Sequence, residues 1–343
     1  MKLVVVDADV LGRRRTGDES YVRNLLRTLP GPAAAAGLRM AAVTRHPELV
    51  LEGIEAVALP ARVQELRMAW SLPRALRGLG ASLVHTQYAM PLRAPCPAVV
   101  TIHDLSFEDE DEELMGRRDR WTFRRVVPRA ARGAARVLTV SERTKRDLVE
   151  RYGVPPERVV VTPNGVDPAF GPEGASYKLQ LASYALAVGA IQPRKNQVAA
   201  LAAAREAGLE LVVAGPLKDE RVAAELRAGG ARLEGYVSTE RLAELYRGAA
   251  CLVQPSRYEG FGLPVLEAMA SGTPVVAVPD PALVEVADDA AVVVEEPRLA
   301  DGIRQALADA GRLRQAGLAR ARAFSWERSA EATVAVYKEA LGA

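Results

Sequence analysis

Two carboxylates stand eight positions apart in the stretch "SRYEGFGLPVLEAMASGTPVVA", residues 256–277. Glu259 comes directly before Gly260, and Gly262 and the start of a predicted helix separate it from Glu267. Two carboxylates can cut a glycosidic bond, bind a metal ion, hold sugar hydroxyls or simply be solvated. Glycines lack a Cβ atom, so the backbone amides around them can approach a ligand closely. The two acids with this glycine turn favour a binding role over two solvated side chains.

The turn lies between a predicted strand, "CLVQPS", and a predicted helix in which Pro264 suits the first position. Glu267 would lie about one turn inside that helix, whose first N–H groups form an anion site. Ligands of open α/β sheets bind beyond the carboxyl ends of the strands, where this turn falls. An acid on the helix can then accept hydrogen bonds from ribose hydroxyls, and an acid on the turn from whatever the phosphates carry. The alternatives are a helix-start carboxylate at Glu267 that the helix dipole favours, and a solvated loop acid at Glu259.

A second cluster, "AVGAIQPRKNQ" at residues 187–197, places two cations at the entry of a predicted helix. Gly189 permits a tight turn after a strand, and Arg194 and Lys195 follow it. An arginine supplies a fork of donors and a lysine a point charge, so the pair suits a diphosphate. Surface solubility is the alternative role of such a pair. The neighbouring glycine turn favours phosphate binding.

Short β-branched runs that alternate with helical, Ala/Leu/Arg-rich segments position both clusters. This alternation predicts two doubly wound, Rossmann-like α/β domains with parallel sheets. A break rich in Pro, Gly and Asp at residues 164–178 predicts the linker between them. We expect an N-terminal domain over residues 1–168, a C-terminal domain over 169–325, and a helix over 326–343 that packs back towards the N-terminal domain. The predicted strands are "KLVVV", "RMAAV", "SLVHT", "AVVTI", "RVLTV", "RVVVT", "YALAV", "LELVVA", "ARLEG", "CLVQP", "TPVVAV" and "AAVVV".

The 343-residue chain is 49% hydrophobic and 26% charged, which is ordinary for a soluble globular protein. Its formal charge of +2 is too small to indicate nucleic-acid binding. Cys96 and Cys251 lie beside apolar residues and are expected to be buried thiols in a reducing compartment. The start "MKLVVVDADVLG" predicts a first strand rather than a signal peptide, and no run of about 18 apolar residues predicts a spanning helix. We therefore expect a cytoplasmic protein, for which peripheral contact with the inner face of the membrane stays open.

Several segments together resemble the retaining glycosyltransferases of family 4 (glycosyltransferase group 1), which have the GT-B fold of two Rossmann-like domains facing a cleft. Glu259 and Glu267 match the family's pair of glutamates with seven residues between them. The resemblance covers nearly the whole chain, and its motifs come in the family's order. The segments are "TGDESYVRNLL", "HTQYAMP", "TIHDLSF", "VLTVSERTKRDLVERYGVP", "VTPNGVDPAF", "PRKN", "GYV" at 235–237, "EGFGLPVLEAMASGTPVVA" and "FSWERSAEATVAVY".

The resemblance implies that a nucleotide-diphosphate sugar binds in the cleft, held mainly by the second domain. Glu267 would accept hydrogen bonds from the ribose hydroxyls, and Arg194 and Lys195 would face the diphosphate. Glu259 would hold hydroxyls of the transferred sugar. The other donor contacts implied for this domain are Gly189, Gly260, the backbone amides of Phe261, Gly262 and Leu263, and the backbone of Tyr236 and Val237 at the base.

In the first domain, the resemblance implies that Gly17, in the turn before "YVRNLLRTL", leaves space for the phosphates and the acceptor. His103 and Asp104 follow the strand "PAVVTI" and would face the cleft near the reacting sugar. A histidine at a strand end is more often structural, so the role of His103 depends on the family match. Ser141 either borders the cleft or simply caps the helix that follows it. The catalytic set that we expect is Glu259, Lys195, His103 and Arg194.

The implied mechanism transfers the sugar with retention, by attack on the face of the leaving group through an oxocarbenium-like state. Lys195, Arg194 and helix-end amides would stabilise the charge that develops on the diphosphate. We expect neither a metal nor a further cofactor, because no cluster with metal-ligand spacing appears and Asp7 and Asp9 form only a weak pair. Many family members have an arginine where this chain has Ala190, so the diphosphate would depend on Lys195 with Arg194 as a substitute.

The expected donor is GDP-mannose, and a UDP-glucose type is the next candidate. The expected acceptor is a saccharide or a lipid-linked glycan, in the synthesis of surface polysaccharide or glycoconjugate. Two alternatives share the fold: a sugar-nucleotide epimerase or phosphorylase-like enzyme, and a non-catalytic subunit that binds nucleotide sugars. A nicotinamide dehydrogenase is poorly supported, since no G-x-G-x-x-G follows the first strand.

Overall fold

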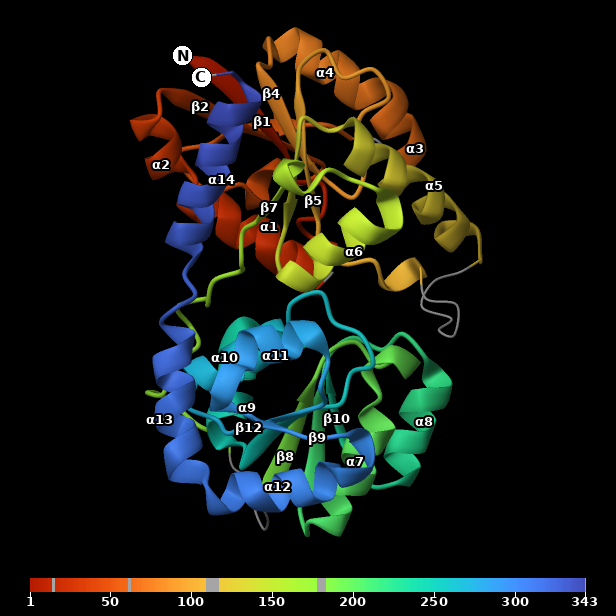
Figure 1. Cartoon of the computed structure of the whole chain (residues 1–343), viewed down its shortest axis with the longest axis vertical. Coiled ribbons are helices and arrows are strands. Elements are labelled where there is room, and N and C mark those ends of the chain that lie inside the picture. The colour runs from red at the N-terminus through yellow and green to blue at the C-terminus, as the bar shows by residue number, and fades with distance from the viewer. Residues whose placement is uncertain (14–15, 61–62, 109–116, 178–182, 343) are drawn as a thin grey trace. The chain divides into compact units, whose positions relative to one another are not determined.

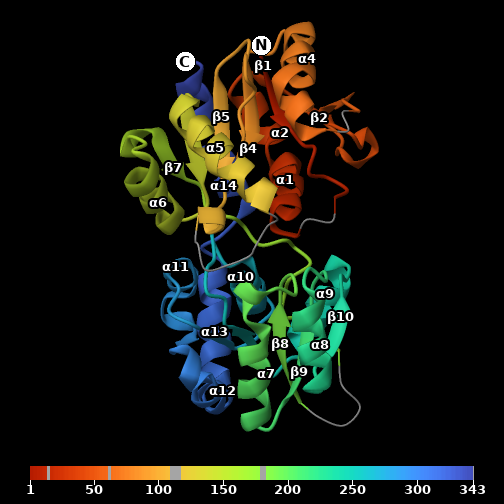
Figure 2. The same cartoon turned by 90° about the vertical axis from the view of Figure 1, so that its right-hand side faces the viewer.

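The computed structural model describes residues 1–13, 16–60, 63–108, 117–177 and 183–342. The chain divides into two compact units (Figure 1 and Figure 2). Among the described residues, the first unit holds 1–108, 117–165 and 326–342, and the second holds 166–325. Each unit is built on its own sheet, with helices on both faces.

The first unit carries a seven-stranded sheet in the order β3-β2-β1-β4-β5-β6-β7. All neighbouring strands are parallel. Helices cover both faces of such a sheet, so its central strands read as continuous apolar runs, and all of β5 is buried. The strands are β1 (Lys2–Asp7), β2 (Leu38–Thr44), β3 (Glu55–Ala58), β4 (Leu83–Gln87), β5 (Ala98–Ile102), β6 (Arg136–Thr139) and β7 (Val159–Val161).

The helices of the first unit lie between these strands in the chain, and α14 comes last. One helical run joins α3 to α4 through a π-helical turn at Arg67–Ser71. The helices are α1 (Thr16–Thr28), α2 (Pro30–Ala35), α3 (Gln64–Leu66), α4 (Leu72–Leu79), α5 (Arg117–Gly133), α6 (Glu142–Tyr152) and α14 (Trp326–Ala340).

Helix α14 is anchored in the first unit by buried aromatic and polar contacts. The ring of Trp326 lies edge-on to Tyr21 of α1, with 6.0 Å between ring centroids. The hydroxyl of Tyr337 lies 2.6 Å from Nδ1 of His85 on β4. Burial lowers the pKa of His85 to about 3, so this imidazole is neutral. The chain thus returns to its first unit after the second is complete.

The second unit carries a six-stranded parallel sheet in the order β10-β9-β8-β11-β12-β13. Its strands are β8 (Tyr184–Val188), β9 (Glu210–Ala214), β10 (Arg232–Gly235), β11 (Cys251–Gln254), β12 (Val275–Ala277) and β13 (Val292–Val293). Its helices are α7 (Gln197–Glu206), α8 (Glu220–Ala228), α9 (Thr239–Gly248), α10 (Leu263–Ala270), α11 (Pro281–Ala287), α12 (Leu299–Ala308) and α13 (Ala310–Ala321).

Both sheets have the winding order of a Rossmann fold, in which the chain winds outward first on one side of the initial strand and then on the other. The direction of winding reverses between β1 and β4 in the first unit, and between β8 and β11 in the second. The loops that follow such a pair of strands diverge at the carboxyl edge of the sheet. That divergence makes a crevice for ligands.

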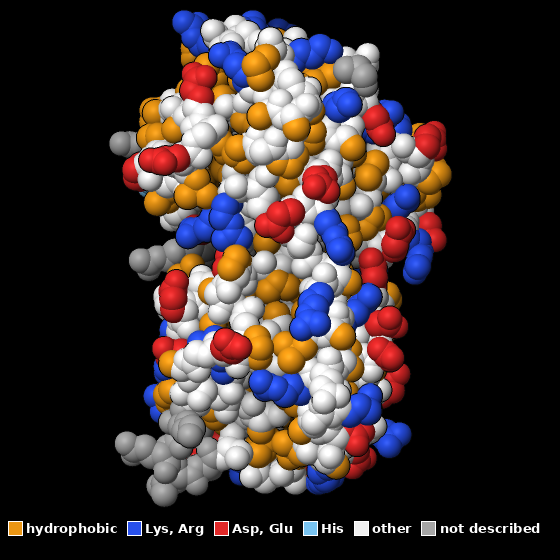
Figure 3. Space-filling view, turned by 90° about the vertical axis from the view of Figure 1, so that its left-hand side faces the viewer, with side chains coloured by type: hydrophobic (Ala, Val, Ile, Leu, Met, Phe, Trp, Pro, Cys, Tyr) orange, Lys and Arg blue, Asp and Glu red, His pale blue; other side chains and the backbone are white. Residues whose placement is uncertain are grey.

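The two predicted doubly wound, parallel-sheet domains are confirmed, and each predicted run forms a strand. The pattern missed β3, because this short edge strand is largely exposed and has no continuous apolar run. None of the helices in the described ranges is long and apolar enough to cross a bilayer. On the face shown in Figure 3, Lys and Arg side chains are interspersed with Asp and Glu instead of forming one basic patch.

Candidate functional site

The two sequence clusters meet at the reversal point of the second sheet. Residues 189–196 follow β8 and residues 255–262 follow β11, and these two strands are neighbours. Parallel strands end at the same edge, so both loops emerge side by side at the carboxyl edge. This is the position that the sheet topology provides for a ligand.

The loop after β8 depends on a close backbone approach. Gly189 has φ +141°, and a Cβ atom on the facing Gly215, after β9, would lie 2.0 Å from the carbonyl oxygen of Gly189. The amide of Gly215 donates in turn to the carbonyl of Gly235 at the end of β10. A side chain at Gly215 would force these turns apart. The three loops therefore pack closely because glycine stands at 215.

Lys195 is delivered to the site by a 3₁₀ turn, Pro193–Lys195, that precedes α7. Asn196 joins the turn to the helix in a left-handed conformation with φ +49°, which asparagine tolerates better than most residues. The lysine stem passes over Gly189, where an added Cβ would lie 3.3 Å from its Cε atom. The segment "PRKN" therefore aims one cation across the end of β8.

The ammonium group of Lys195 and the carboxylate of Glu259 form a close ion pair, with 2.6 Å between Nζ and Oε1. Gln254, at the end of β11, donates from Nε2 to the same oxygen over 2.7 Å. Glu259 is 6% exposed. Burial by itself would raise its pKa, but the charges of Lys195 and Arg194 outweigh that effect and lower the pKa to about 2. Glu259 is therefore ionised at neutral pH.

Arg194 joins the two loops to each other. Its guanidinium group donates from Nη1 to the carbonyl of Tyr258, and its own carbonyl accepts from the amide of Arg257 over 3.0 Å. The same Nη1 atom lies 3.6 Å from Oε2 of Glu259. These contacts hold the loop after β11 in register with the loop after β8.

The loop between Glu259 and α10 is fixed from the next helix. Asp280 accepts from the amide of Glu259 over 3.2 Å through Oδ2, while its Oδ1 accepts from the amide of Ala282 at the start of α11. Gly262 caps α10 with φ +106°, and a Cβ on it would lie 2.7 Å from Leu283. Helix α10 begins at Leu263, so Pro264 is its second residue and not its first as predicted.

Three other donor-binding candidates lie in the second unit. Phe261 is buried, and its ring lies edge-on to Phe324 with 5.8 Å between centroids. Tyr236, just after β10, is 49% exposed, and Val237 is half-buried. The close approach at Gly215 and Gly235 brings the start of this loop to the turn at Gly189.

Glu267 lies on the second turn of α10, where a tyrosine holds it. The hydroxyl of Tyr246, from α9, donates to Oε2 of Glu267 over 2.8 Å. Burial raises the pKa of Glu267 to about 8, the hydrogen bond from Tyr246 works against that rise, and the negative charge of Asp167 adds to it. Glu267 and Glu259 thus lie in one loop–helix segment with opposite shifts of their pKa values.

Two candidate residues of the first unit, His103 and Asp104, directly follow β5. His103 is buried, with its ring edge-on to Tyr21 at 4.6 Å and tilted against Tyr88 at 5.6 Å. Its Nε2 atom is buried without a hydrogen-bond partner in the described structure. Burial lowers the pKa of His103, although Asp18 and Asp104 oppose this shift. The imidazole is therefore predominantly neutral at neutral pH.

The neighbours of His103 are engaged in local structure. Asp104 accepts from the amide and the hydroxyl of Ser106, over 3.1 and 2.9 Å. Ser141 is an N-cap, as the simpler of its two predicted roles required, because it accepts from the amide of Thr144 at the start of α6. Gly17 lies in the first turn of α1 and not in the turn before the helix, since helix formation begins already at Thr16.

Asp7 and Asp9, the weak candidate metal pair, bind arginines. Arg67, with no exposed surface, donates to both oxygens of Asp7 over 2.6 Å each. Arg45 donates to both oxygens of Asp9, over 2.9 and 3.2 Å. These ion pairs tie the end of β1 to the segments after β2 and before α4.

Sequence reasoning missed the residues that support the two glutamates and the turn at Gly189. These are Gln254, Asp280, Tyr246 and Gly215. Asp280 carries the pattern of an N-cap before Pro281, so its helix-capping role could have been predicted from that dipeptide. The other three have no local pattern that distinguishes them from ordinary core residues.

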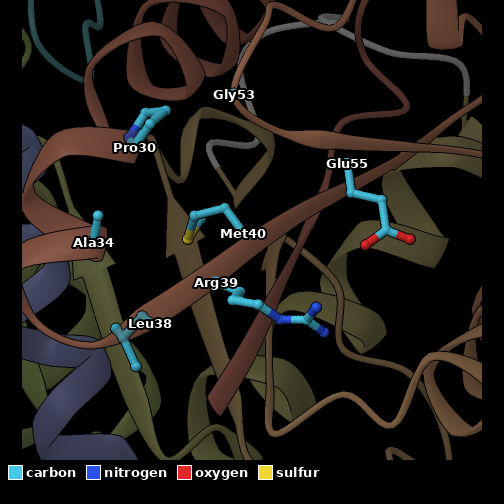
Figure 4. Close-up of a pocket in the computed structure, with 7 residues that line it drawn as sticks. All are labelled: Pro30, Ala34, Leu38, Arg39, Met40, Gly53 and Glu55. Carbon is cyan, nitrogen blue, oxygen red and sulfur yellow. The ribbon is translucent and has the colours of Figure 1, made fainter. Parts of the chain in front are cut away.

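A hollow of about 340 Å³ lies elsewhere, in the first unit (Figure 4). It is found where β2 and β3 begin, which is the amino edge of the sheet. Ligands of such sheets bind at the opposite, carboxyl edge, so we do not assign this hollow to the site. Its lining residues are Pro30, Ala34, Leu38, Arg39, Met40, Gly53 and Glu55.

Comparison with known proteins places the chain in one family. Residues 180–323 match the family model of the glycosyl transferases group 1, and residues 16–170 match that of glycosyltransferase family 4. O-antigen chain mannosyltransferase B of Escherichia coli is 32% identical over 334 residues, which are 89% of this chain and 84% of that protein. The chain therefore belongs to the group 1 glycosyltransferases of family 4 and has the GT-B fold.

Two further similarities agree with this assignment. The MMP alpha-(1->4)-mannosyltransferase of Mycolicibacterium hassiacum is 33% identical over 277 residues, covering 71% of this chain and 66% of that protein. The structure of sucrose-phosphate synthase from Thermosynechococcus elongatus superposes with a TM-score of 0.77 over 99% of both chains, at 21% identity. At that identity the superposition bears on the fold alone.

Proposed function

We propose that this glycosyltransferase moves mannose from GDP-mannose to a saccharide or lipid-linked glycan acceptor, in the synthesis of a surface polysaccharide or glycoconjugate. The choice of sugar is supported by the two relatives, both of which are named as mannosyltransferases. In the same proposal the anomeric configuration is retained and no metal ion takes part. UDP-glucose is the second donor to test.

The observation that carries the proposal is the 2.6 Å contact between Lys195 and Glu259 at the reversal point of the second sheet. A diphosphate accepts charge-assisted hydrogen bonds from an ammonium group, and a carboxylate accepts them from sugar hydroxyls. A nucleotide sugar presents both kinds of group within a few bonds of each other. One half-buried cation beside one ionised acid suits the junction between diphosphate and sugar.

In the transfer step, the bond between the anomeric carbon and the diphosphate oxygen breaks, and the nucleoside diphosphate leaves with the electron pair. A new bond forms between the anomeric carbon and the acceptor oxygen, on the same face of the sugar, and the acceptor proton passes to the leaving phosphate oxygen. Lys195 and the first amides of α10 are oriented before the reaction, so they stabilise the developing phosphate charge without reorganising. Arg194 contributes its charge from the same turn as Lys195.

In this proposal the two glutamates hold hydroxyl groups and neither is a nucleophile. Glu259, ionised at neutral pH, accepts hydrogen bonds from hydroxyls of the transferred sugar. Glu267, which lies on α10, accepts hydrogen bonds from the ribose hydroxyls. From the first unit we assign to the reacting sugar the neutral imidazole of His103, whose Nε2 atom has no partner among the described residues. Membrane contact and a cytoplasmic location remain expectations from the sequence.

Thermal unfolding with a panel of GDP-, UDP-, ADP- and dTDP-sugars, followed by product analysis, tests the proposal. A ligand at one hundred times its Kd stabilises by about 2.7 kcal/mol, which a melting curve resolves. We expect the largest shift with GDP-mannose, and transfer only when an acceptor glycan is added. Conversion of the donor without acceptor would identify an epimerase instead. Binding without any turnover across acceptors would indicate a non-catalytic subunit.

A further inference from the structure

Glu267 has one engaged and one available oxygen. Its Oε2 accepts from the hydroxyl of Tyr246 over 2.8 Å. No hydrogen bond to Oε1 is found among the described residues, and Glu267 is only half-buried. A glutamate side chain has three rotatable bonds and can adopt many orientations on a helix surface. A bond to one oxygen selects one orientation and so directs the other oxygen.

The side chain of Tyr246 is held rigidly. A side chain must be fixed itself if it is to fix the orientation of another. It has no exposed surface and lies near the end of α9. Its ring is packed edge-on against Phe170, with 5.7 Å between centroids. Its carbonyl accepts from the hydroxyl of Thr273, over 2.7 Å, at the end of the loop after α10. A tyrosine has only two side-chain torsions, and packing on this scale fixes both of them.

The bond joins two different elements of the site. Tyr246 is on α9, which follows β10, and Glu267 is on α10, which follows β11. The buried hydroxyl of Tyr246 needs a hydrogen-bond partner, and the carboxyl of the half-buried Glu267 provides it. An apolar side chain at position 246 could fill the same buried space. The hydroxyl is explained by what it does to Glu267.

We propose that Tyr246 is a positioning residue for donor recognition, whose hydroxyl holds Oε2 of Glu267 so that Oε1 faces the ribose hydroxyls. This inference rests on the proposed role of Glu267 at the ribose. Tyr246 contacts no part of the donor itself. Tyr246 restricts the side-chain torsions of Glu267 before the donor binds. Less conformational entropy is then lost on binding, which is a form of preorganisation.

The test compares ligands with and without ribose hydroxyls. GDP, 2′,3′-dideoxy-GDP and inorganic pyrophosphate are titrated calorimetrically into the wild-type protein and Tyr246→Phe; if the panel selects another base, the corresponding nucleotide pair is used. The substitution keeps the ring and its packing. We expect about tenfold weaker binding of GDP, near the upper value of one hydrogen bond. The dideoxy nucleotide and pyrophosphate should bind both proteins equally.

Tyr184→Phe is the matched control. Tyr184 is equally buried in the same unit, and its hydroxyl donates over 2.7 Å to the carbonyl of Leu245, the residue before Tyr246. Loss of that hydroxyl should lower stability without changing the ratio of GDP to dideoxy-GDP affinity. A structural effect of Tyr246→Phe would weaken all three ligands together, and that result would overturn the inference. Unchanged GDP binding would overturn it as well.

A Glu267→Ala variant separates this inference from the function on which it rests. If Glu267→Ala abolishes the preference for GDP over the dideoxy nucleotide and Tyr246→Phe does not reduce it, the positioning role is wrong and the ribose role stands. If Glu267→Ala weakens both nucleotides equally, the ribose role itself fails. A reduced preference in both variants, with Tyr184→Phe unchanged, is the result that we expect.

Discussion

Lys195 and Glu259 are 64 positions apart in the chain, yet their charged groups lie 2.6 Å from each other. The sequence assigned one to the diphosphate and the other to the sugar, as two separate contacts. The structure shows that the two groups form one ion pair, in which each charge neutralises the other. Under the proposed function, the donor shares or replaces this ion pair on binding, which would link recognition of the phosphate to recognition of the sugar.

Lys195→Ala should weaken binding of a nucleoside diphosphate at least about tenfold, and binding of the nucleoside much less. The reason is that a hydrogen bond to a charged group contributes about 1.5–3 kcal/mol and only the diphosphate offers that partner. Calorimetric Kd values for GDP and guanosine, or for the pair of whichever base binds, measure the difference. Equal losses for both ligands would argue against a phosphate contact.

Glu259→Gln should reduce transfer by two or more orders of magnitude while the protein stays folded. The amide keeps the shape of the side chain, but it removes the charge that balances Lys195 and orients the sugar. Turnover with GDP-mannose and acceptor, together with a melting curve, provides the measurement. The exposed Glu295→Gln serves as control and should retain full activity. Near wild-type turnover of Glu259→Gln would show that the role assigned to Glu259 is wrong.

Activity should be unchanged by EDTA, because Lys195 and Arg194 supply the positive charge at the expected diphosphate position. The test measures transfer before and after chelation and dialysis, and again after Mg²⁺ or Mn²⁺ is added. A large loss that a divalent ion restores would overturn the metal-independent mechanism.

The pH dependence of folding should report the state of Glu267. Its folded pKa of about 8 lies above the ordinary value of 4.5, so the native state binds more protons than the unfolded state between these values. This contribution to stability is present below pH 4.5 and is lost as the pH rises towards 8, at most about 1.4 kcal/mol for each pH unit. The glutamine in Glu267→Gln cannot ionise, so the variant does not lose this contribution as the pH rises. From pH 5 to pH 8, its free energy of unfolding should therefore increase relative to that of the wild type. Urea unfolding of both proteins at these two pH values measures the difference. If the free energy of unfolding changes by the same amount in both proteins, the prediction is wrong.

Gly262→Ala should lower the free energy of unfolding by about 1–3 kcal/mol, the cost of a left-handed backbone at a non-glycine residue. The residue has φ +106°, and the new methyl group would press on the buried Leu283. Gly78→Ala is the control: it lies in α4 with open space around it and should be neutral or stabilising. Donor affinity should fall in the Gly262 variant as well, since this glycine shapes the loop after Glu259. A stability equal to that of Gly78→Ala would contradict the steric argument.

Much of the fold could be predicted because its determinants are local. Runs such as "AVVTI" form strands since every position is buried in a parallel sheet, and β3 was missed because an exposed edge strand needs no such run. Gly262 and Pro264 predicted the turn and the helix, with an error of one residue at the start of α10. Gly17 was placed before α1 instead of inside it for the same reason, since helix ends depend on contacts as well as on local pattern.

By itself, the sequence determined the class of fold, the family and the residues that can carry charge to the carboxyl edge of the second sheet. These follow from patterns about ten residues long and from motifs with fixed spacing. Only the tertiary structure decided which groups meet: Lys195 with Glu259 and Gln254, Tyr246 with Glu267, Asp280 with the amide of Glu259. The physical reason is that these partners follow different strands, and strand order brings them together. Their opposite pKa shifts arise from that placement, because burial and neighbouring charge belong to the folded chain.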